Sequence, residues 1–330
     1  MLLITMENIT VRRYKTEDYI LWNNFILASK NATFLFHRDF MEYHQDRFED
    51  FSIVIEKNGD FVGVFPANIN RDVVYSHAGL SYGGLVVKNE MRLESFVVLF
   101  NKLFCFLETF HVNKVVWKEI PSFYTLQGND EWKYLMHLSD AKLLKRYLYS
   151  VIQLKSEIRC SKSIKRDSNL GKRFGFTIEK SNDLSFFWKE VLEPTLLSVH
   201  GVQPVHSYDE ISSLKNKFPN QIQFFSILLN NKIVGGTVLF VDKNVVHVQY
   251  ISALREYRKY GALDYLFYKL INEEFSSYEF FDFGSSHEEG GNAINEGLLF
   301  WKESFGARSF TQDVYEIDVK SANSLKKFLI

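Results

Sequence analysis

The stretch that decides the fold is VVHVQYIS (residues 245–252), which leads through LREYRKYGA (residues 254–262) into an apolar helical segment. Its first eight residues are mostly β-branched or aromatic and predict a strand, and Gly261 stands just before the helical pattern. A strand, a turn and a helix start in this order present backbone N–H groups and the positive end of a helix dipole, which suit a pyrophosphate. Arg258 and Lys259 add positive charge there. An ordinary helix start would look the same.

The elements on either side of this stretch repeat an order found earlier in the chain. Helix, helix, hairpin, strand, helix and strand are expected at 16–31, 38–47, 51–68, 79–87, 90–110 and 112–119. The same order is expected at 186–199, 210–218, 222–242, 245–252, 261–275 and 280–284. Turns are expected at Asn58-Gly59 and Asn230-Asn231. We therefore predict a mixed α/β protein with two domains of one architecture, residues 1–150 and 151–330.

Composition limits the classes of function. The chain has 330 residues, a net charge of -1 and 46% hydrophobic residues, which is typical of a globular protein and argues against a dedicated nucleic-acid binder. Cys105 and Cys160 have no CxxC neighbour, so neither a disulfide framework nor a metal site is expected. The apolar run 96–106 is too short to span a bilayer, and no signal peptide precedes it. We expect a cytoplasmic protein that binds no membrane, no nucleic acid and no metal.

A basic segment joins the two predicted domains. Between residues 155 and 173 it holds seven positive side chains (Lys155, Arg159, Lys162, Lys165, Arg166, Lys172, Arg173) against Glu157 and Asp167. The segment is either a solvated helix face or a rim that attracts the phosphates of a ligand.

The turn at 258–262 resembles the acyl-CoA motif of the GNAT superfamily, Q/R-x-x-G-x-G/A. Arg258 and Gly261 match the motif, whereas Leu263 replaces its last small residue. Further segments are similar to Fem-like proteins, which carry two GNAT domains in tandem: FDFGS (281–285), NEGL (295–298) and FWKESFGA (300–307), with Trp188, Leu192 and Pro204 upstream. The segments FLFHR (34–38), FPA (65–67) and HAGLSYGG (77–84) match in the front half. The resemblance implies that each domain has a mixed, mostly antiparallel sheet flanked by helices.

The resemblance also implies substrates. The chain lacks the long charged insertion that many aminoacyl-tRNA-dependent Fem proteins carry, and it looks most like N-acyltransferases of nucleotide-linked amino sugars for surface polysaccharides. The implied donor is acetyl-CoA or a short hydroxyacyl-CoA such as 3-hydroxybutyryl-CoA. The implied acceptor is the amino group of a dTDP-linked 3-amino-3,6-dideoxyhexose. We expect a monomer or a homodimer.

Catalytic residues are expected at two places. GNAT strands splay apart, so a backbone N–H between Gln249 and Ser252 is the expected oxyanion donor, and the resemblance places the coenzyme along Gln249, Tyr250, Ile251, Arg258, Lys259, Gly261 and Ala262. The loop 285–289 follows the second splayed strand and supplies His287 as the expected base, while Glu288 and Glu289 would share this role or bind the ammonium. A surface loop histidine and solvated carboxylates are the plainer interpretation.

Acceptor-binding residues are expected in three groups. His200 and His206 bracket an irregular loop, Asn292, Asn295 and Glu296 surround a helix start, and His37, His77 and Tyr82 lie in the front half, where Tyr82 would stack on a base. Asn295 would equally well cap the helix, and ordinary structural hydrogen bonding is the alternative for the front-half residues.

Three other functions remain open from the sequence. The first is aminoacyl transfer from a charged tRNA, and the second is O-acylation of a polysaccharide precursor. The third is a non-catalytic tandem GNAT protein that binds a nucleotide sugar without turning over acyl-CoA.

Overall fold

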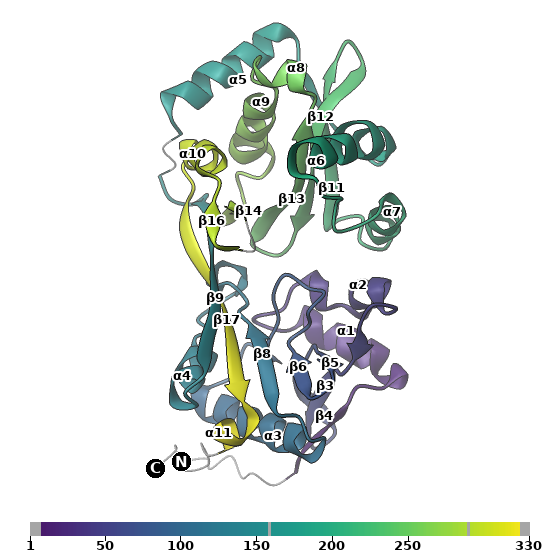
Figure 1. The fold of residues 1–330 in the computed structure, drawn as a ribbon, viewed down its shortest axis with the longest axis vertical. Coiled ribbons are helices and arrows are strands. Elements are labelled where there is room, and N and C mark those ends of the chain that lie inside the picture. The colour runs from purple at the N-terminus through teal and green to yellow at the C-terminus, as the bar shows by residue number, and fades with distance from the viewer. Residues whose placement is uncertain (1–7, 158–159, 289–290, 324–330) are drawn as a thin grey trace. The chain divides into compact units, whose positions relative to one another are not determined.

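The computed structural model describes residues 8–157, 160–288 and 291–323 of the chain, which fall into two compact units (Figure 1). Residues 8–147 and 311–323 form unit 1, and residues 148–310 form unit 2. The expected domains, 1–150 and 151–330, differ from these units at the C-terminal end. The reason is that residues 314–318 of strand β17 (Arg308–Asp318) pair with strand β8 (Lys114–Lys118) of unit 1.

Unit 1 combines two groups of strands with helices. Its other strands are β1 (Ile9–Arg13), β2 (Glu49–Asp50), β3 (Ile53–Lys57), β4 (Asp60–Phe65), β5 (Asn68–Asn70), β6 (Val73–Tyr75) and β7 (Val86–Val87). Its helices are η1 (Thr16–Asp18), α1 (Tyr19–Leu27), η2 (Phe34–Phe36), α2 (Arg38–Met41), η3 (Glu42–His44), α3 (Leu93–Thr109), η4 (Ser122–Tyr124), α4 (Glu131–Leu138) and α11 (Val319–Asn323).

The strands of unit 1 run in the orders β1-β3-β4-β7 and β17-β8-β6-β5-β2. The expected β3–β4 hairpin is confirmed, because Asn58 and Gly59 both have positive φ (53° and 89°), as a tight two-residue turn requires. The amphipathic helix α3 buries residues such as Phe100, Leu103 and Phe104 against these strands. The strand expected at 79–87 is reduced to β7.

Unit 2 is built around the strands β10 (Thr177–Ser181), β11 (Ile222–Leu229), β12 (Lys232–Val241), β13 (Val245–Ala253), β14 (Phe280–Ser285), β15 (His287–Glu288) and β16 (Ala293–Ile294). Its helices are α5 (Lys162–Phe174), η5 (Phe187–Leu192), α6 (Glu193–His200), α7 (Tyr208–Lys217), α8 (Arg255–Arg258), α9 (Ala262–Lys269), η6 (Leu270–Glu274) and α10 (Glu296–Ser304). With β9 (Lys142–Gln153), the strand order is β10-β11-β12-β13-β14-β9, and among these strands only β13 and β14 pair in parallel.

One core cluster of unit 2 lies between this sheet and α9. Leu266 and Phe267 of α9 pack against Val246, Phe281 and Phe283 of the sheet. The segment η5 is π-helical and lies just before Pro194 of α6. Proline cannot donate a hydrogen bond to the carbonyl of the residue four positions earlier, so a widened turn at this place accommodates it.

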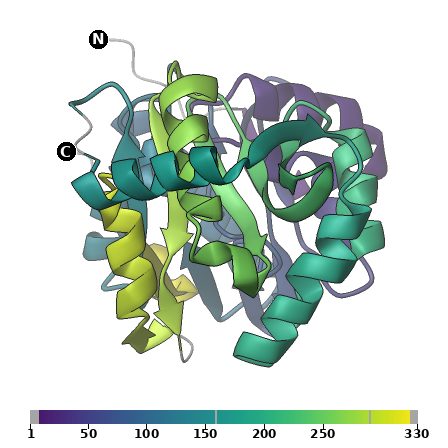
Figure 2. The same cartoon turned by 90° about the horizontal axis from the view of Figure 1, so that it is seen from above.

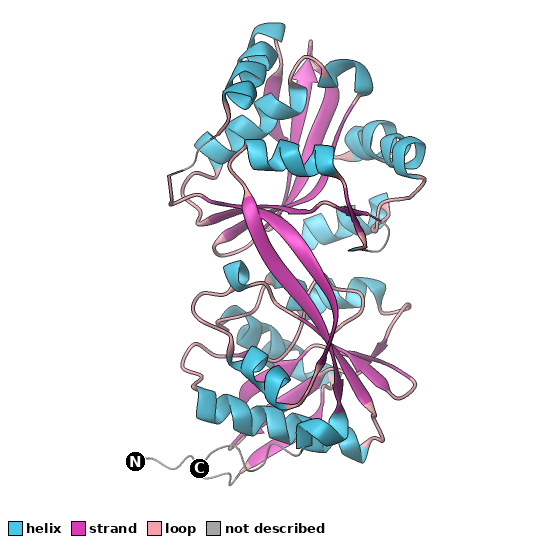
Figure 3. Cartoon of the chain, turned by 60° about the vertical axis from the view of Figure 1, so that its left-hand side comes forward, coloured by secondary structure: helices cyan, strands magenta, loops and turns pink. Residues whose placement is uncertain are grey.

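Two strands, β9 (Lys142–Gln153) and β17, are neighbours and have residues in both units (Figure 3). Within unit 1, Asp313 of β17 accepts two hydrogen bonds from the Arg146 guanidinium, at 2.7 and 2.8 Å, and its backbone N–H donates to Glu119. Across the described ranges, no helix is both long and apolar enough to cross a membrane.

Candidate functional site

The central feature of unit 2 is a fork between the parallel strands β13 and β14. Their pairing covers three positions and ends at His247 opposite Asp282, although β13 continues to Ala253. The register of β12 on β13 shifts between Val238 and Leu239, so Gln249 is an extra residue that forms a β-bulge. A bulge bends and twists its strand, which explains why β13 leaves β14 at this point.

The open edge of β13 presents backbone groups beyond the fork. The N–H of Leu254 donates to the carbonyl of Val234 in β12, and in an antiparallel ladder every second residue makes such bonds. Ser252 and Tyr250 therefore bond to β12, whereas the N–H groups of Ile251 and Ala253 point away from β12. Of the expected oxyanion donors, Ile251 is the one with this orientation. The Ser252 hydroxyl donates to the carbonyl of Val191, 3.3 Å away.

One face of the fork carries Tyr250 and His206. The Tyr250 hydroxyl lies 2.6 Å from His206 Nδ1, and the edge of Trp188 packs against the Tyr250 ring. Burial raises the pKa of Tyr250. His206 is thus brought to β13, and His200 is the last residue of α6; their role on the acceptor side stays a prediction.

His247 and Asp282 form a dyad at the vertex of the fork, which the sequence analysis did not identify. Nδ1 of His247 lies 2.7 Å from Oδ2 of Asp282, and Oδ1 of Asp282 accepts a 2.7 Å hydrogen bond from the N–H of Gly284. The Asp282 side chain is fully buried, whereas the His247 side chain is 18% exposed to solvent. A His on one strand and an Asp on the next gave no recognisable spacing, because their pairing depends on the register of β13 and β14.

Lys302 of α10 lies beneath the same corner. Its ammonium donates to the carbonyls of Gly284, at 3.2 Å, and Ser285, at 2.7 Å. Burial lowers the pKa of Lys302 to about 8, while the charge of Asp282 acts in the opposite direction. These two hydrogen bonds from Lys302 fix the backbone at the end of β14.

The expected pyrophosphate turn is tightly packed. Gly261 has φ +76°, and a Cβ there would come within 2.1 Å of the Asp167 carbonyl oxygen of α5, so only glycine fits. Figure 2 shows α5 crossing next to α9. Ala262 is buried, and Nε of the exposed Arg258 donates to the carbonyl of Ala253. The first turn of α9 is therefore partly covered by α5.

An acidic residue also lies in that first turn. Asp264 accepts a 3.0 Å hydrogen bond from the indole N–H of Trp301 in α10. Burial raises the pKa of Asp264. The outer surface of this region is basic: α5 and α8 expose Lys162, Lys165, Arg166, Lys172, Arg173, Arg255 and Arg258, followed by Lys259. We call these eight residues the basic rim.

The loop expected to hold the base forms a small hairpin of its own. His287 and Glu288 make up β15, which pairs with β16, and Glu288 accepts a 2.7 Å hydrogen bond from the side-chain amide of Asn295. Asn295 caps α10 by accepting from the N–H of Leu298, which favours its capping role. Glu296 and Asn292 are exposed, and Glu289 lies outside the described residues.

The residues expected to bind a nucleotide in unit 1 do not form one group. Tyr82 is buried, donates to the Thr33 hydroxyl and packs on Phe36. Its ring is therefore part of the hydrophobic core instead of facing a ligand. Nδ1 of His37 lies 3.1 Å from Oδ2 of Asp39. Burial lowers the pKa of His77 to about 3, and His77 stacks on His44 with 5.2 Å between ring centroids.

His44 and His77 contribute to a polar cavity of about 590 Å³ in unit 1. Its wall mixes charges of both signs with aromatic rings: Arg13, Tyr14, Lys15, Thr16, Arg38, Met41, Glu42, His44, Gln45, Asp46, Phe48, Glu49, Asp50 and His77. Lys118 donates to the carbonyls of Ala78 and Leu80, which follow His77 in the chain. Burial lowers the pKa of Lys118 to about 8. Tyr124 is buried against Tyr82.

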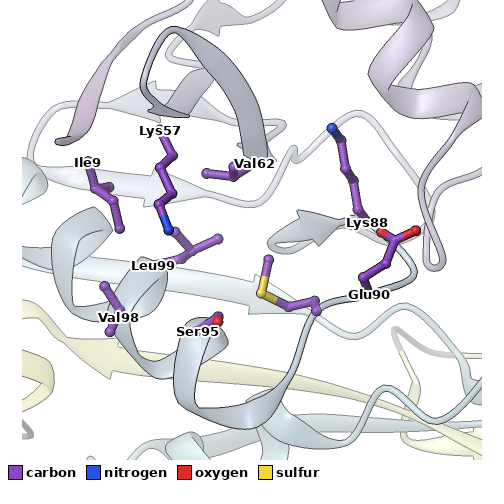
Figure 4. Close-up of a pocket in the computed structure, with 9 residues that line it drawn as sticks. Ile9, Lys57, Val62, Lys88, Glu90, Ser95, Val98 and Leu99 are labelled. Atoms are coloured by element: carbon purple, nitrogen blue, oxygen red, sulfur yellow. The ribbon is translucent and has the colours of Figure 1, made fainter. Parts of the chain in front are cut away.

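A second, apolar cavity of about 210 Å³ lies between β1, β4 and α3 in unit 1 (Figure 4). Val62, Val98 and Leu99 line it together with Lys57 and Lys88. Within the described ranges, no three His, Cys, Asp or Glu side chains gather as a metal site would require.

Comparison with known proteins agrees with this geometry. Residues 160–290 match a family model described as "Acetyltransferase (GNAT) domain". The structure is similar to that of FemX, with a TM-score of 0.66 and 11% identity over 96% of this chain and 99% of that chain. The C-terminal domain of a putative lysylphosphatidylglycerol synthetase from Agrobacterium fabrum is also similar, with a TM-score of 0.58 and 15% identity over 94% of each chain.

A third similar structure is L-PGS from Bacillus licheniformis, with a TM-score of 0.52 and 11% identity over 81% of this chain and 83% of that chain. No curated protein sequence matches the chain significantly. The expected fold, a mixed α/β protein with two tandem GNAT-like domains, is confirmed.

Proposed function

We propose that the protein is an N-acyltransferase that moves an acyl group from a phosphate-bearing carrier to an amine at the fork of β13 and β14. The observation that carries this proposal is the fork itself, in a segment that matches a GNAT acetyltransferase model. The N–H of Ile251 points into the space that β14 has left, where it would donate to the oxyanion of the tetrahedral intermediate. The open edge of β13 would hold the amide-rich arm of coenzyme A as a neighbouring strand holds its partner.

The donor we propose is acetyl-CoA or a short hydroxyacyl-CoA. The backbone of β13 beyond His247 fits the arm of this co-substrate, because its outward N–H and C=O groups alternate as in an open sheet edge. The basic rim would attract the phosphates, with Arg258 and Lys259 closest in sequence to the turn at Gly261. The thioester supplies the activated acyl group, and the protein positions it.

The acceptor we propose is the amino group of a dTDP-linked 3-amino-3,6-dideoxyhexose. The polar groups of Tyr250, His206 and His247 on one face of the fork support a ligand of this polarity, because hydroxyl and imidazole groups lie there beside the ring of Trp188. Hydroxyl-rich ligands need such a mixture of hydrogen-bond donors, acceptors and ring faces.

Transfer from an aminoacyl-tRNA is the second candidate, and one observation favours it. The helix α5 covers the first turn of α9, where a coenzyme pyrophosphate is expected, and replaces the open cradle by an exposed row of basic side chains. Such a row suits an extended phosphate backbone as well as one nucleotide.

A thiol-release assay tests the proposal. The protein is mixed with acetyl-CoA or 3-hydroxybutyryl-CoA and a dTDP-3-amino-3,6-dideoxyhexose, and the free thiol is followed with a thiol-reactive dye. We expect release that depends on the acceptor. If no acyl-CoA is consumed and a charged tRNA loses its aminoacyl group to an amine, the second candidate replaces the first. If neither donor is consumed, the proposed function is wrong.

A further inference from the structure

The His247–Asp282 dyad lies where the proposed reaction needs a base. We propose that His247 is the general base for the acceptor amine and that Asp282 positions it. This inference rests on the proposed function, because it assigns a role within that reaction. The dyad marks the last paired position of β13 and β14 and therefore lies at the vertex of the fork.

The dyad is on the face of the sheet that also carries His206. Phe240 of β12 is the register partner of His247, so the two side chains share one face. The His206 ring contacts the Phe240 ring, with 6.3 Å between the centroids, and is hydrogen-bonded to Tyr250. The opposite face is packed by α9. An acceptor that entered past the loop containing His206 would therefore meet His247 before it met the hydrophobic core.

Hydrogen bonds fix the orientation of the imidazole. A carboxylate only accepts hydrogen bonds, so Nδ1 of His247 carries the hydrogen that points to Oδ2 of Asp282. In the neutral ring this leaves the lone pair on Nε2, as in other His–Asp pairs in which the carboxylate selects the tautomer. Oδ1 of Asp282 is held by the N–H of Gly284, so the carboxylate cannot rotate away from the histidine without losing that bond.

The charged and titratable groups around the dyad come from three elements. Asp282 faces His247 from β14, Lys302 reaches the end of β14 from α10, and Tyr250 with His206 lies on the same face of β13. The Lys302 ammonium bonds to the carbonyls of Gly284 and Ser285, and both oxygens of Asp282 are taken by His247 and Gly284. The carboxylate is therefore hydrogen-bonded to His247 and Gly284, and its charge also acts on Lys302.

In the proposed step, Nε2 of His247 takes one proton from the acceptor ammonium, and the lone pair of the neutral amine attacks the acyl carbon. The C–N bond forms, the C–S bond of the thioester breaks, and a second proton passes from the nitrogen to the leaving thiolate. The imidazolium then releases its proton to solvent, so one amide, one thiol and one proton are formed. General bases of this kind contribute roughly 10²- to 10⁴-fold to a rate.

The first test needs no acyl donor. Side-chain ¹⁵N NMR of the histidines in the full-length chain, assigned with His247→Gln, reports which ring nitrogen carries the hydrogen. We expect Nδ1–H at His247 in the wild type and a mixture of tautomers in Asp282→Asn. A hydrogen on Nε2 of neutral His247 in the wild type would overturn the proposal. This readout also separates the dyad from the proposed function.

The second test uses turnover of the best donor and acceptor pair from the thiol-release assay. We expect His247→Ala to lower kcat by 100-fold or more, with KM for the donor unchanged, and added imidazole to restore part of kcat. Asp282→Asn should lower kcat about 10-fold without rescue by imidazole. His137→Gln, an exposed site on α4, is the control and should keep wild-type kcat.

The outcomes distinguish the two claims. An active enzyme in which His247→Ala keeps kcat within threefold of wild type, or in which imidazole restores nothing to a folded variant, contradicts the dyad and leaves the acyltransferase intact. A protein that consumes no donor but shows the expected tautomer contradicts the proposed function and, with it, the role of His247 as base, while the orientation of His247 by Asp282 is upheld.

Discussion

The Tyr250 hydroxyl is hydrogen-bonded to His206 Nδ1, 2.6 Å away. The same hydroxyl accepts a 3.2 Å hydrogen bond from the backbone N–H of His206. One side chain of β13 therefore holds both the ring and the backbone of a residue from the loop between α6 and α7. Both residues are buried, so water does not replace these bonds. The loop position on this face of the fork depends on a single hydroxyl.

Removal of that hydroxyl should destabilise unit 2. In Tyr250→Phe, the N–H of His206 loses an acceptor and its Nδ1 loses a donor, and a buried polar group left without a partner costs about 1–3 kcal/mol. Urea unfolding of the full chain measures the loss. Tyr268→Phe, at a half-buried position of α9, is the matched control and should stay within about 0.5 kcal/mol of wild type. Equal stabilities of the two variants would contradict the role of the hydroxyl.

Replacement of Gly261 should be costly for a different reason. Gly261→Ala forces an L-residue into φ +76° and brings its Cβ within 2.1 Å of the Asp167 carbonyl oxygen. We expect a loss of at least about 1–3 kcal/mol, because both the backbone strain and the contact with α5 are unfavourable. Gly297→Ala, where the nearest atom is 3.6 Å from the added Cβ, should be neutral or stabilising. Thermal unfolding compares the two, and a neutral Gly261→Ala would show that α5 moves aside.

Lys302 should make stability depend on alkaline pH. Burial lowers its pKa to about 8 from 10.5, so between these pH values the unfolded chain binds more protons than the folded one. The contribution of Lys302 to the free energy of unfolding therefore rises with pH in that window, by up to about 1.4 kcal/mol per pH unit. In Lys302→Met this contribution disappears. Urea unfolding at pH 8 and pH 10 gives the two slopes, and identical slopes for wild type and variant would rule out the effect.

The basic rim should govern affinity for the donor and not for the acceptor. We expect the double variant Arg255→Gln/Lys259→Gln to raise KM for acyl-CoA by roughly 10-fold at low salt, and this difference should shrink at high ionic strength because salt screens exposed charges. Lys232→Gln, an exposed lysine at the β11–β12 turn, serves as the control. Steady-state kinetics at two salt concentrations checks this. An unchanged KM would place the donor phosphates elsewhere.

Local patterns in the sequence predicted most of the elements that surround the fork. The hairpin at Asn230-Asn231 is confirmed, because both residues have the positive φ that a tight turn needs, and β13 begins and ends within one residue of its expected bounds. The dyad could not be predicted in the same way. His247 and Asp282 meet only through the register of two parallel strands that are far apart in the sequence, and a bulge at Gln249 determines where that register ends.

For other residues, the sequence could not show whether the side chain is buried in the hydrophobic core or faces a ligand. Tyr82 looked available for stacking, but its ring lies between Phe36 and Tyr124 in unit 1. The strand β17 was missed because its pairing with β8 joins residues 114–118 to 314–318, a separation that no local pattern encodes. His287, Glu288 and Asn295 remain predictions about the acceptor side.

The return of β17 to unit 1 also sets the order in which the chain can fold on the ribosome. Residues 148–310 of unit 2 are continuous, so all strand residues of unit 2 have been synthesised before residues 314–318 of β17 can pair with β8. Unit 1 is begun first but lacks Asp313, and with it the contacts to Arg146 and Glu119, until all of unit 2 has been synthesised. Closing so long a loop is slow. During translation, unit 1 therefore exposes the edge of β8 for longer than any edge of unit 2 and depends most on protection from aggregation.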